Sequence, residues 1–141
     1  MQVHFFFLVN KITLRERKRL KAFVPTIFRR NNKKLQSINY IFCDDEYLFE
    51  INSRHLRHKY YTDIITFDLS SDPKQVNGEI YISVDRVRDN ANKLKKTIQE
   101  ELHRVVFHGA LHLCGYMDKT ASQKSEMRFQ EDKLLKLYFR K

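Results

Sequence analysis

The sequence contains little glycine, proline or cysteine and no tryptophan: three Gly, two Pro and two Cys in 141 residues. So few glycines and prolines exclude a collagen-like chain and a chain made mainly of linkers. The two cysteines, Cys43 and Cys114, lie far apart and form no Cys-x-x-Cys pair, so we expect free thiols in a reducing compartment. Hydrophobic residues, at 42%, and aromatic residues, at 13%, are plentiful. This composition predicts one folded domain with a substantial core.

Long hydrophobic runs are also absent. No apolar run approaches the ~20 residues that a membrane-spanning helix needs. The longest, from Phe5 to Val9, lacks the basic start, the length and the small-residue cleavage site of a signal peptide. We interpret it as a buried strand, and we expect a cytoplasmic protein with no membrane partner.

The charge is strongly one-sided. There are 27 Lys and Arg against 17 Asp and Glu, which gives a net charge of +10. A charge of this size is typical of nucleic-acid-binding domains, although ordinary soluble domains can also be basic. Basic residues gather between residues 11 and 34, where Glu16 is the only acid, and again at Arg54, Arg57 and Lys59, which precede two tyrosines. Because basic side chains neutralise phosphates and aromatic rings stack on unpaired bases, we predict that this second group contacts RNA; the alternative is a solvated basic surface.

The spacing of apolar and capping residues predicts a mixture of strands and helices. We expect strands over residues 2–9, 38–43, 63–68 and 79–84. We expect helices that begin at the capping residues Thr13, Asp44, Asp85, Thr97 and Thr120, with Gly115 ending the fourth. Pro25 should kink or end the first helix near Val24, and Asn77-Gly78 should close a hairpin turn over residues 70–78. The result is an α+β fold, a single domain over residues 1–141 with a small mixed four-stranded sheet and about five helices.

The stretch that is most informative about chemistry runs from His108 to Asp118. His108 and His112 are four residues apart on a predicted helix, which puts both rings on one face, one turn apart. Two such nitrogens can bind one tetrahedral ion at about 2.0–2.1 Å. Gly115 allows the chain to turn back past the helix end, and Asp118 is the first metal-binding side chain after that turn. Histidine pairs at this spacing also occur on helix surfaces without a metal, so the motif alone leaves both interpretations open.

The segment His-Gly-x-Leu-His-Leu-x-Gly-Tyr, residues 108–116, resembles the signature of the YbeY family, the zinc-dependent endoribonucleases of bacterial rRNA maturation. Residues 62–67 are similar to that family's Thr-Asp-Val-Leu-Ser-Phe strand, and residues 78–83 are similar to its Gly-Asp-Ile-x-Ile-Ser strand. The order and spacing of these segments agree over residues 36–137. The resemblance implies cleavage of single-stranded RNA, maturation of the 16S rRNA 3′ end of the small ribosomal subunit, and ribosome quality control.

The sequence departs from the family pattern in two places. The family's third zinc ligand is a histidine, and Asp118 stands at that position. Because Asp also binds zinc, the resemblance implies one Zn²⁺ held by His108, His112 and Asp118, on the end of the helix that carries the two histidines. The family's active-site arginine corresponds to Leu56, one residue before Arg57, so its role is not assigned to a residue of this sequence.

Two other functions remain open at this point. A metalloprotease-like hydrolase would use the same helix, but its His-Glu-x-x-His motif needs a glutamate where Gly109 stands. A non-catalytic ribosome-associated RNA-binding factor would hold a structural zinc ion, with Cys114 as the candidate fourth ligand, although an ideal helix directs Cys114 away from the two histidines.

Glu101, two turns before His108, either orients a ligand histidine or lies on the surface.

Overall fold

The computed structural model describes residues 2–57 and 61–140, which form one sheet and five helices. The strands are β1 (Val3–Phe7), β2 (Lys34–Cys43), β3 (Ile64–Asp68) and β4 (Gln75–Ser83). The helices are α1 (Arg17–Arg30), α2 (Asp45–Leu56), α3 (Val84–Leu94), α4 (Ile98–Leu113) and α5 (Ala121–Tyr138). The strand order is β1-β2-β4-β3; β2 is parallel to β1 and β4, and β3 is antiparallel to β4. The predicted α+β fold, with a mixed four-stranded sheet and five helices, is confirmed.

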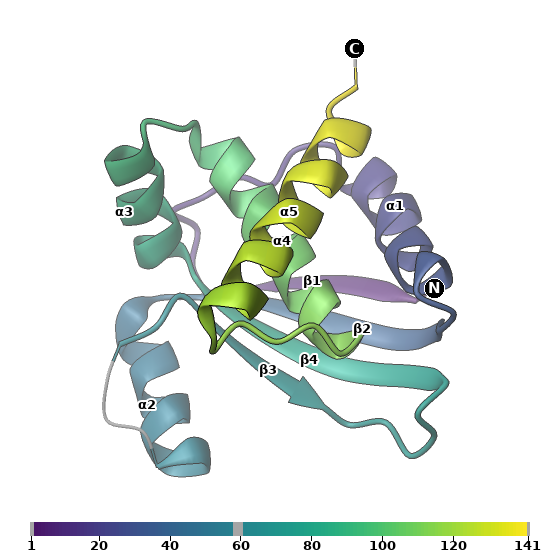
Figure 1. Ribbon diagram of the computed structural model, residues 1–141. Coiled ribbons are helices and arrows are strands. Elements are labelled where there is room, and N and C mark those ends of the chain that lie inside the picture. The colour runs from purple at the N-terminus through teal and green to yellow at the C-terminus, as the bar shows by residue number, and fades with distance from the viewer. Residues whose placement is uncertain (1, 58–60, 141) are drawn as a thin grey trace.

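The helices cover the two faces of the sheet unequally (Figure 1). Helices α1, α3, α4 and α5 lie over one face, and α2 lies on the other. The main core fills the space between the four helices and the sheet, and its largest side chains are Phe28, Tyr40, Phe42, Phe107 and Tyr138. A smaller cluster beneath α2 consists of Cys43, Leu48 and Ile65. Helix α4 is at the centre of the larger layer, because it contacts α1, α3, α5, β3 and β4.

Two glycines allow α4 to lie close to the sheet. A Cβ atom at Gly109 would sit 2.7 Å from Ile80 Cδ1 and 3.1 Å from Ile64 Cδ1. Gly78 of β4 faces the same helix, and a Cβ atom there would meet Leu113 Cδ1 at 2.6 Å. The missing side chains therefore set the distance between the C-terminal half of α4 and strands β3 and β4.

Several local signals in the sequence are confirmed. Thr97 and Thr120 cap α4 and α5, each with a complete capping box. The Asp44 side chain accepts a backbone hydrogen bond at the start of α2. Gly115 follows the end of α4 with a φ of 106°, a conformation that favours glycine. Within the described residues, no helix is long and apolar enough to cross a bilayer.

The predicted start of the first helix is wrong, and the helix does not end near Val24. Helix α1 begins after Glu16 rather than after Thr13, because Glu16 adopts a left-handed conformation with φ 51° that interrupts a right-handed helix. The helix then continues past Pro25 to Arg30. Ile27, beyond the proline, is buried in the main core, so packing offsets the hydrogen bond that proline cannot donate.

The hairpin between β3 and β4 exists, but the prediction of its turn is wrong. Asn77 and Gly78 lie inside β4, and the chain reverses nearer Asp72, which bridges to Gln75. Gly78 is present because Leu113 packs against it, not because a turn needs its flexibility. Strands β2 and β4 consequently begin four residues earlier than expected, at Lys34 and Gln75.

The cap of α3 is also different from the prediction. Ser83 caps this helix and accepts a hydrogen bond from the backbone N–H of Arg86. The Asp85 carboxylate instead accepts a hydrogen bond from the backbone N–H of Asp45, with an N–O distance of 2.9 Å. Asp85 therefore ties the start of α2 to α3 rather than capping its own helix.

Candidate metal centre

The end of α4 and the segment after it bring three metal-binding side chains together. His108 and His112 lie one turn apart on α4, with ring centroids 4.5 Å apart. The backbone N–H groups of Gly115 and Tyr116 donate hydrogen bonds back to carbonyls of the last turn, so the chain folds across the helix end. This reversal returns Asp118 to the two histidines.

The distances from Asp118 to the two histidines match those of a tetrahedral metal site, and all three ligand atoms lie within 4.8 Å of one another. Nε2 of His108 lies 3.3 Å from Oδ2 of Asp118, and Nε2 of His112 lies 3.4 Å from the same oxygen. Two atoms bound to one tetrahedral ion at about 2.0–2.1 Å are about 3.3–3.4 Å apart, so the observed distances fit zinc. All three residues are partly buried, and a hollow of about 250 Å³ opens beside His112 against Thr66 and Asp68 of β3. Three ligands beside an open space are typical of a catalytic zinc site rather than a structural one.

Hydrogen bonds orient both histidines for metal binding. Nδ1 of His112 donates to the carbonyl oxygen of Tyr116 at 2.9 Å, and Nδ1 of His108 donates to the Glu131 carboxylate at 2.5 Å. Because Nδ1 of each ring makes this hydrogen bond, Nε2 is the ring nitrogen that faces Asp118. Burial, together with the neighbouring His108, lowers the pKa of His112, which favours the neutral form that binds metals.

A buried charge network stands behind His108. Arg104 donates two hydrogen bonds to Glu101, at 2.8 and 2.5 Å, and one to Glu131 at 3.1 Å. Both glutamates are almost completely buried, and Asp63 lies 3.8 Å from Arg104. Burial alone would raise the pKa of Glu131, but His108 and Arg104 outweigh burial and lower it. Glu131 is therefore a carboxylate held in place from two sides, and it fixes the His108 ring.

Sequence reasoning found the ligand cluster but not this network. Glu101 was expected either to orient a histidine or to lie on the surface, and both expectations are wrong: Glu101 is 2% exposed and binds Arg104. Glu131, which does orient His108, comes from the middle of α5, 23 residues along the chain. A carboxylate at a position of α5 that otherwise faces the core was the one signal that could have identified it.

Comparison with known proteins decides the family. A family model described as endoribonuclease YbeY matches residues 9–138. The chain belongs to the YbeY family. Proteins named endoribonuclease YbeY are 46% identical over 135 residues in Cytophaga hutchinsonii, covering 96% of this chain and 94% of that one, and 46% identical over 125 residues in Flavobacterium psychrophilum, covering 89% of each.

A solved structure has the same fold as this YbeY family member. The solution structure of TM1509 from Thermotoga maritima superposes with a TM-score of 0.65 and 26% sequence identity, covering 98% of this chain and 89% of that one. The resemblance found in the sequence is thus confirmed, and with it the expectation of an enzyme in a family of endoribonucleases.

Two of the three predicted RNA contacts of this YbeY chain, Arg54 and Arg57, do not join the ligand cluster directly. Arg54 pairs with Glu50 on α2 at 3.5 Å, and Arg57 follows the end of that helix in a left-handed conformation. Helix α2 covers the face of the sheet opposite α4 (Figure 1). No hydrogen bond or ion pair links either arginine to the three ligands within residues 2–57 and 61–140. Lys59 lies outside the described residues, and Leu56, at the position of the family's arginine, is exposed.

Cys114 stands apart from the YbeY ligand cluster. Among the described residues, the group whose ligand atoms lie within 4.8 Å of one another consists of His108, His112 and Asp118. Cys114 packs against the main core, and burial raises the pKa of its thiol to about 12. Both Cys43 and Cys114 are free thiols, as expected. A protonated, core-facing thiol is a poor fourth ligand, because zinc binds the thiolate form.

Proposed function

We propose that this protein is a zinc-dependent endoribonuclease that cuts single-stranded RNA and acts in rRNA processing. The observation that carries the proposal is the 3.3–3.4 Å spacing of His108 Nε2 and His112 Nε2 from Asp118 Oδ2, in a member of a family named for endoribonucleases. Its substrate is the 3′ end of 16S rRNA in the small ribosomal subunit, and the activity serves ribosome maturation and quality control. The protein works in the cytoplasm, with residues 1–141 as one hydrolase domain.

The proposed chemistry divides between the ligand cluster and the residues around it. His108, His112 and Asp118 would hold one zinc ion, which would supply a Lewis acid for activating water and polarising a phosphoryl oxygen. Glu131 and the Tyr116 carbonyl keep the two histidine rings in the orientation that binding requires. Arg54, Arg57 and Lys59 neutralise phosphates of the bound strand.

The deciding experiment is elemental analysis of the purified, tag-free protein and of Asp118→Ala. We expect about one zinc ion per wild-type chain and a marked loss in the variant, because the cluster has no other carboxylate at that position. Asp89→Ala is the matched control, since Asp89 is exposed on α3 and, in the part of the chain that the structure describes, its ion pair is with Lys93. A wild-type protein that takes up no metal when zinc is supplied would refute the proposed site.

Cleavage assays separate the proposal from its rivals. His112→Ala should remove cleavage of single-stranded RNA while leaving the fold intact, because His112 is at the partly buried edge of the helix. Cleavage that is unchanged in this variant would reveal a contaminating nuclease. Zinc-loaded protein that binds RNA without cutting it would favour the non-catalytic RNA-binding factor, and cleavage of a peptide panel would favour the metalloprotease-like hydrolase.

A further inference from the structure

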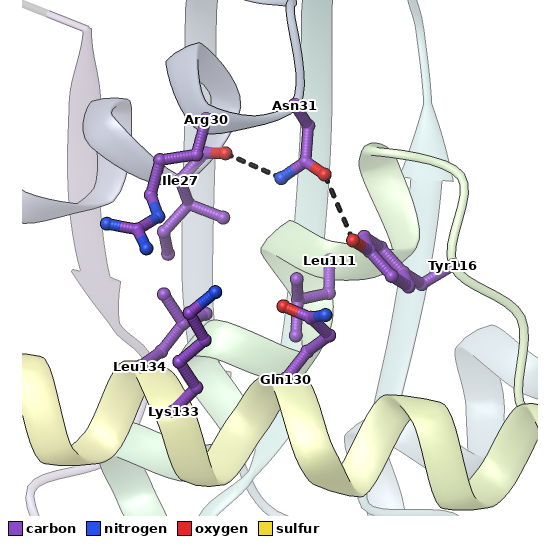
Figure 2. A pocket seen from close by; sticks show the side chains of 8 residues that line it. All are labelled: Ile27, Arg30, Asn31, Leu111, Tyr116, Gln130, Lys133 and Leu134. Carbon is purple, nitrogen blue, oxygen red and sulfur yellow. Dashed lines mark hydrogen bonds between the residues drawn. The ribbon is translucent and has the colours of Figure 1, made fainter.

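A cavity of about 330 Å³ lies between the C-terminal end of α1, the last turns of α4 and the middle of α5. Figure 2 shows Arg30 reaching into it from α1 while Gln130 and Lys133 reach toward it from α5. Leu111 of α4 and Leu134 of α5 form its apolar floor. Its volume is at the lower end of the range for pockets that hold small organic groups.

The charge of this α1–α5 cavity is positive only. Arg30 and Lys133 line it, and no carboxylate does. Neither cation forms an ion pair with any residue in the described ranges, whereas Arg104, Arg86 and Lys11 are all paired with acids. Two unpaired cations that face one hollow attract an anion, and an arginine beside a lysine suits the oxygens of a phosphate group.

The remaining polar wall of the cavity is preorganised. The Tyr116 hydroxyl donates to Oδ1 of Asn31 at 3.1 Å, and the Asn31 amide in turn donates to the Ile27 carbonyl at 2.8 Å (Figure 2). The Gln130 amide nitrogen donates to Glu126 at 3.0 Å, so its carbonyl oxygen remains available as an acceptor. A ligand would therefore meet a hydrogen-bonded aromatic and amide surface next to the two cations Arg30 and Lys133.

A second hollow of about 410 Å³ shares the wall made by Arg30 and Lys133. It adds Lys136, the single carboxylate Asp132 and Phe129, whose side chain is 60% exposed, so three cations outnumber one acid among the described residues that line it. An exposed aromatic ring beside a row of cations is the arrangement by which proteins hold single-stranded nucleic acid, because the ring stacks on a base while the cations bind phosphates.

The cavity also adjoins the candidate metal centre. Tyr116 lines the cavity with its side chain, while its carbonyl oxygen accepts the hydrogen bond from His112. A strand bound in the cavity would thus contact the same segment that carries Asp118. The two sites can be occupied by one RNA chain on neighbouring surfaces of the segment after α4.

We propose that the α1–α5 cavity is an anchoring subsite for single-stranded RNA: a backbone phosphate binds between Arg30 and Lys133, and an adjacent base stacks on Phe129. The subsite rests on the proposed function, because it holds the same strand that the metal centre cuts. Free nucleotides and inorganic phosphate carry the same phosphate oxygens as RNA, so the experiment must distinguish binding of RNA from binding of these small ligands.

The experiment measures the affinity of a fluorescent single-stranded RNA oligonucleotide by anisotropy, with excess chelator so that no strand is cut. Arg30→Gln/Lys133→Gln should weaken binding about tenfold and reduce the slope of log affinity against log salt by about 0.7, the contribution of the one phosphate that the two cations share. Phe129→Ala should weaken binding about fivefold and leave the slope unchanged. The matched control is Arg15→Gln/Lys18→Gln, which removes the same charge from exposed positions without an ion pair among the described residues.

Each outcome decides the proposal. Equal losses in the cavity variant and the control would overturn it, because only net charge would then matter, and so would unchanged binding in the cavity variant. Adenosine monophosphate and inorganic phosphate are tested in the same way. If either binds the wild type but not the cavity variant, while both proteins bind RNA equally well, the proposal is overturned in favour of a free phosphate ligand. Because chelated protein is used, these results do not depend on metal content or cleavage, so failure of the subsite is distinguishable from failure of the nuclease proposal.

Discussion

At the scale of single residues, Glu131 connects the last helix to the candidate metal centre. Its carboxylate is 1% exposed and is shared between His108 and Arg104. His108, His112 and Asp118 could be predicted because their relation is local, set by one helical turn and one glycine turn. The contact between Glu131 and His108 is between two helices, and no spacing in one sequence encodes which residues of two helices will face each other.

Replacement of Glu131 tests its positioning role. Glu131→Gln keeps the shape of the side chain but removes the negative charge that orients the His108 ring, so zinc affinity should fall about 10- to 100-fold. The measurement is competition with a chromophoric chelator, accompanied by thermal unfolding of the metal-free protein. Glu126→Gln, at an exposed position of the same helix, is the control and should bind zinc like the wild type. Affinity within twofold of the wild type in Glu131→Gln would contradict the role.

His103 makes stability depend on pH. Burial lowers its pKa, Arg19 adds to this effect, and the hydrogen bond to the Gln99 carbonyl opposes it. Because the pKa of this ring is lower in the folded state than its usual ~6.5 in the unfolded chain, protons bind preferentially to the unfolded chain. The contribution of His103 to stability is therefore complete above about pH 6.5 and is lost as the pH falls from there through its folded-state value.

The test compares urea unfolding of the wild type and His103→Phe between pH 5 and 8. The phenylalanine can pack among Phe107, Tyr138 and Phe139, which surround the histidine ring, and it cannot be protonated. We expect the stability difference between the two proteins to shift in favour of the variant below about pH 6.5. A difference that stays constant over the whole range would show that His103 does not titrate in this way.

At the scale of helices and strands, the predicted caps Asp44, Thr97 and Thr120 are confirmed, whereas Thr13 and Asp85 do not cap their helices. Thr97 and Thr120 begin their helices as predicted, because a capping box is satisfied by residues within one turn. The helix does not end near Pro25, one of the two outcomes expected there, and Gly78 does not lie in a turn. Each of these residues is placed by packing against distant parts of the chain, which overrides local preference.

The close contact between α4 and the sheet predicts the effect of Gly109→Ala. The added methyl group meets Ile80 Cδ1 at 2.7 Å, and overpacking of this kind typically costs about 1–3 kcal/mol. Alanine gains up to about 1 kcal/mol over glycine in a helix, so the net result should be a loss of up to about 2 kcal/mol in urea unfolding. Ile80→Val removes the clashing carbon, and the double variant should therefore lose less stability than the sum of the two single variants. If the stability losses of the two single variants add up to the loss of the double variant, the added methyl group does not contact Ile80, and α4 has moved away from the sheet.

At the scale of the whole molecule, the net charge of +10 predicts that added salt weakens RNA binding. Each phosphate contact with a single strand contributes about −0.7 to the slope of log affinity against log salt, so three contacts from Arg54, Arg57 and Lys59 would give about −2. The triple variant of these residues to glutamine should flatten the wild-type slope by that amount. A wild-type slope near zero would exclude RNA binding through phosphates.

The tight packing of α4 against the sheet at Gly109 has an evolutionary consequence. Zinc proteases with two histidines on one helix carry their catalytic glutamate directly after the first histidine, and in this chain that position is Gly109. The wall formed by Ile80 and Ile64 leaves no room there even for a methyl group. A mutation from glycine to glutamate would therefore arise as a folding defect before it could act as a catalytic base. Descendants of this protein could gain peptide hydrolysis through a glutamate at this position only after the helix and the sheet had moved apart. The change from RNA cleavage to peptide cleavage would therefore need more than one substitution.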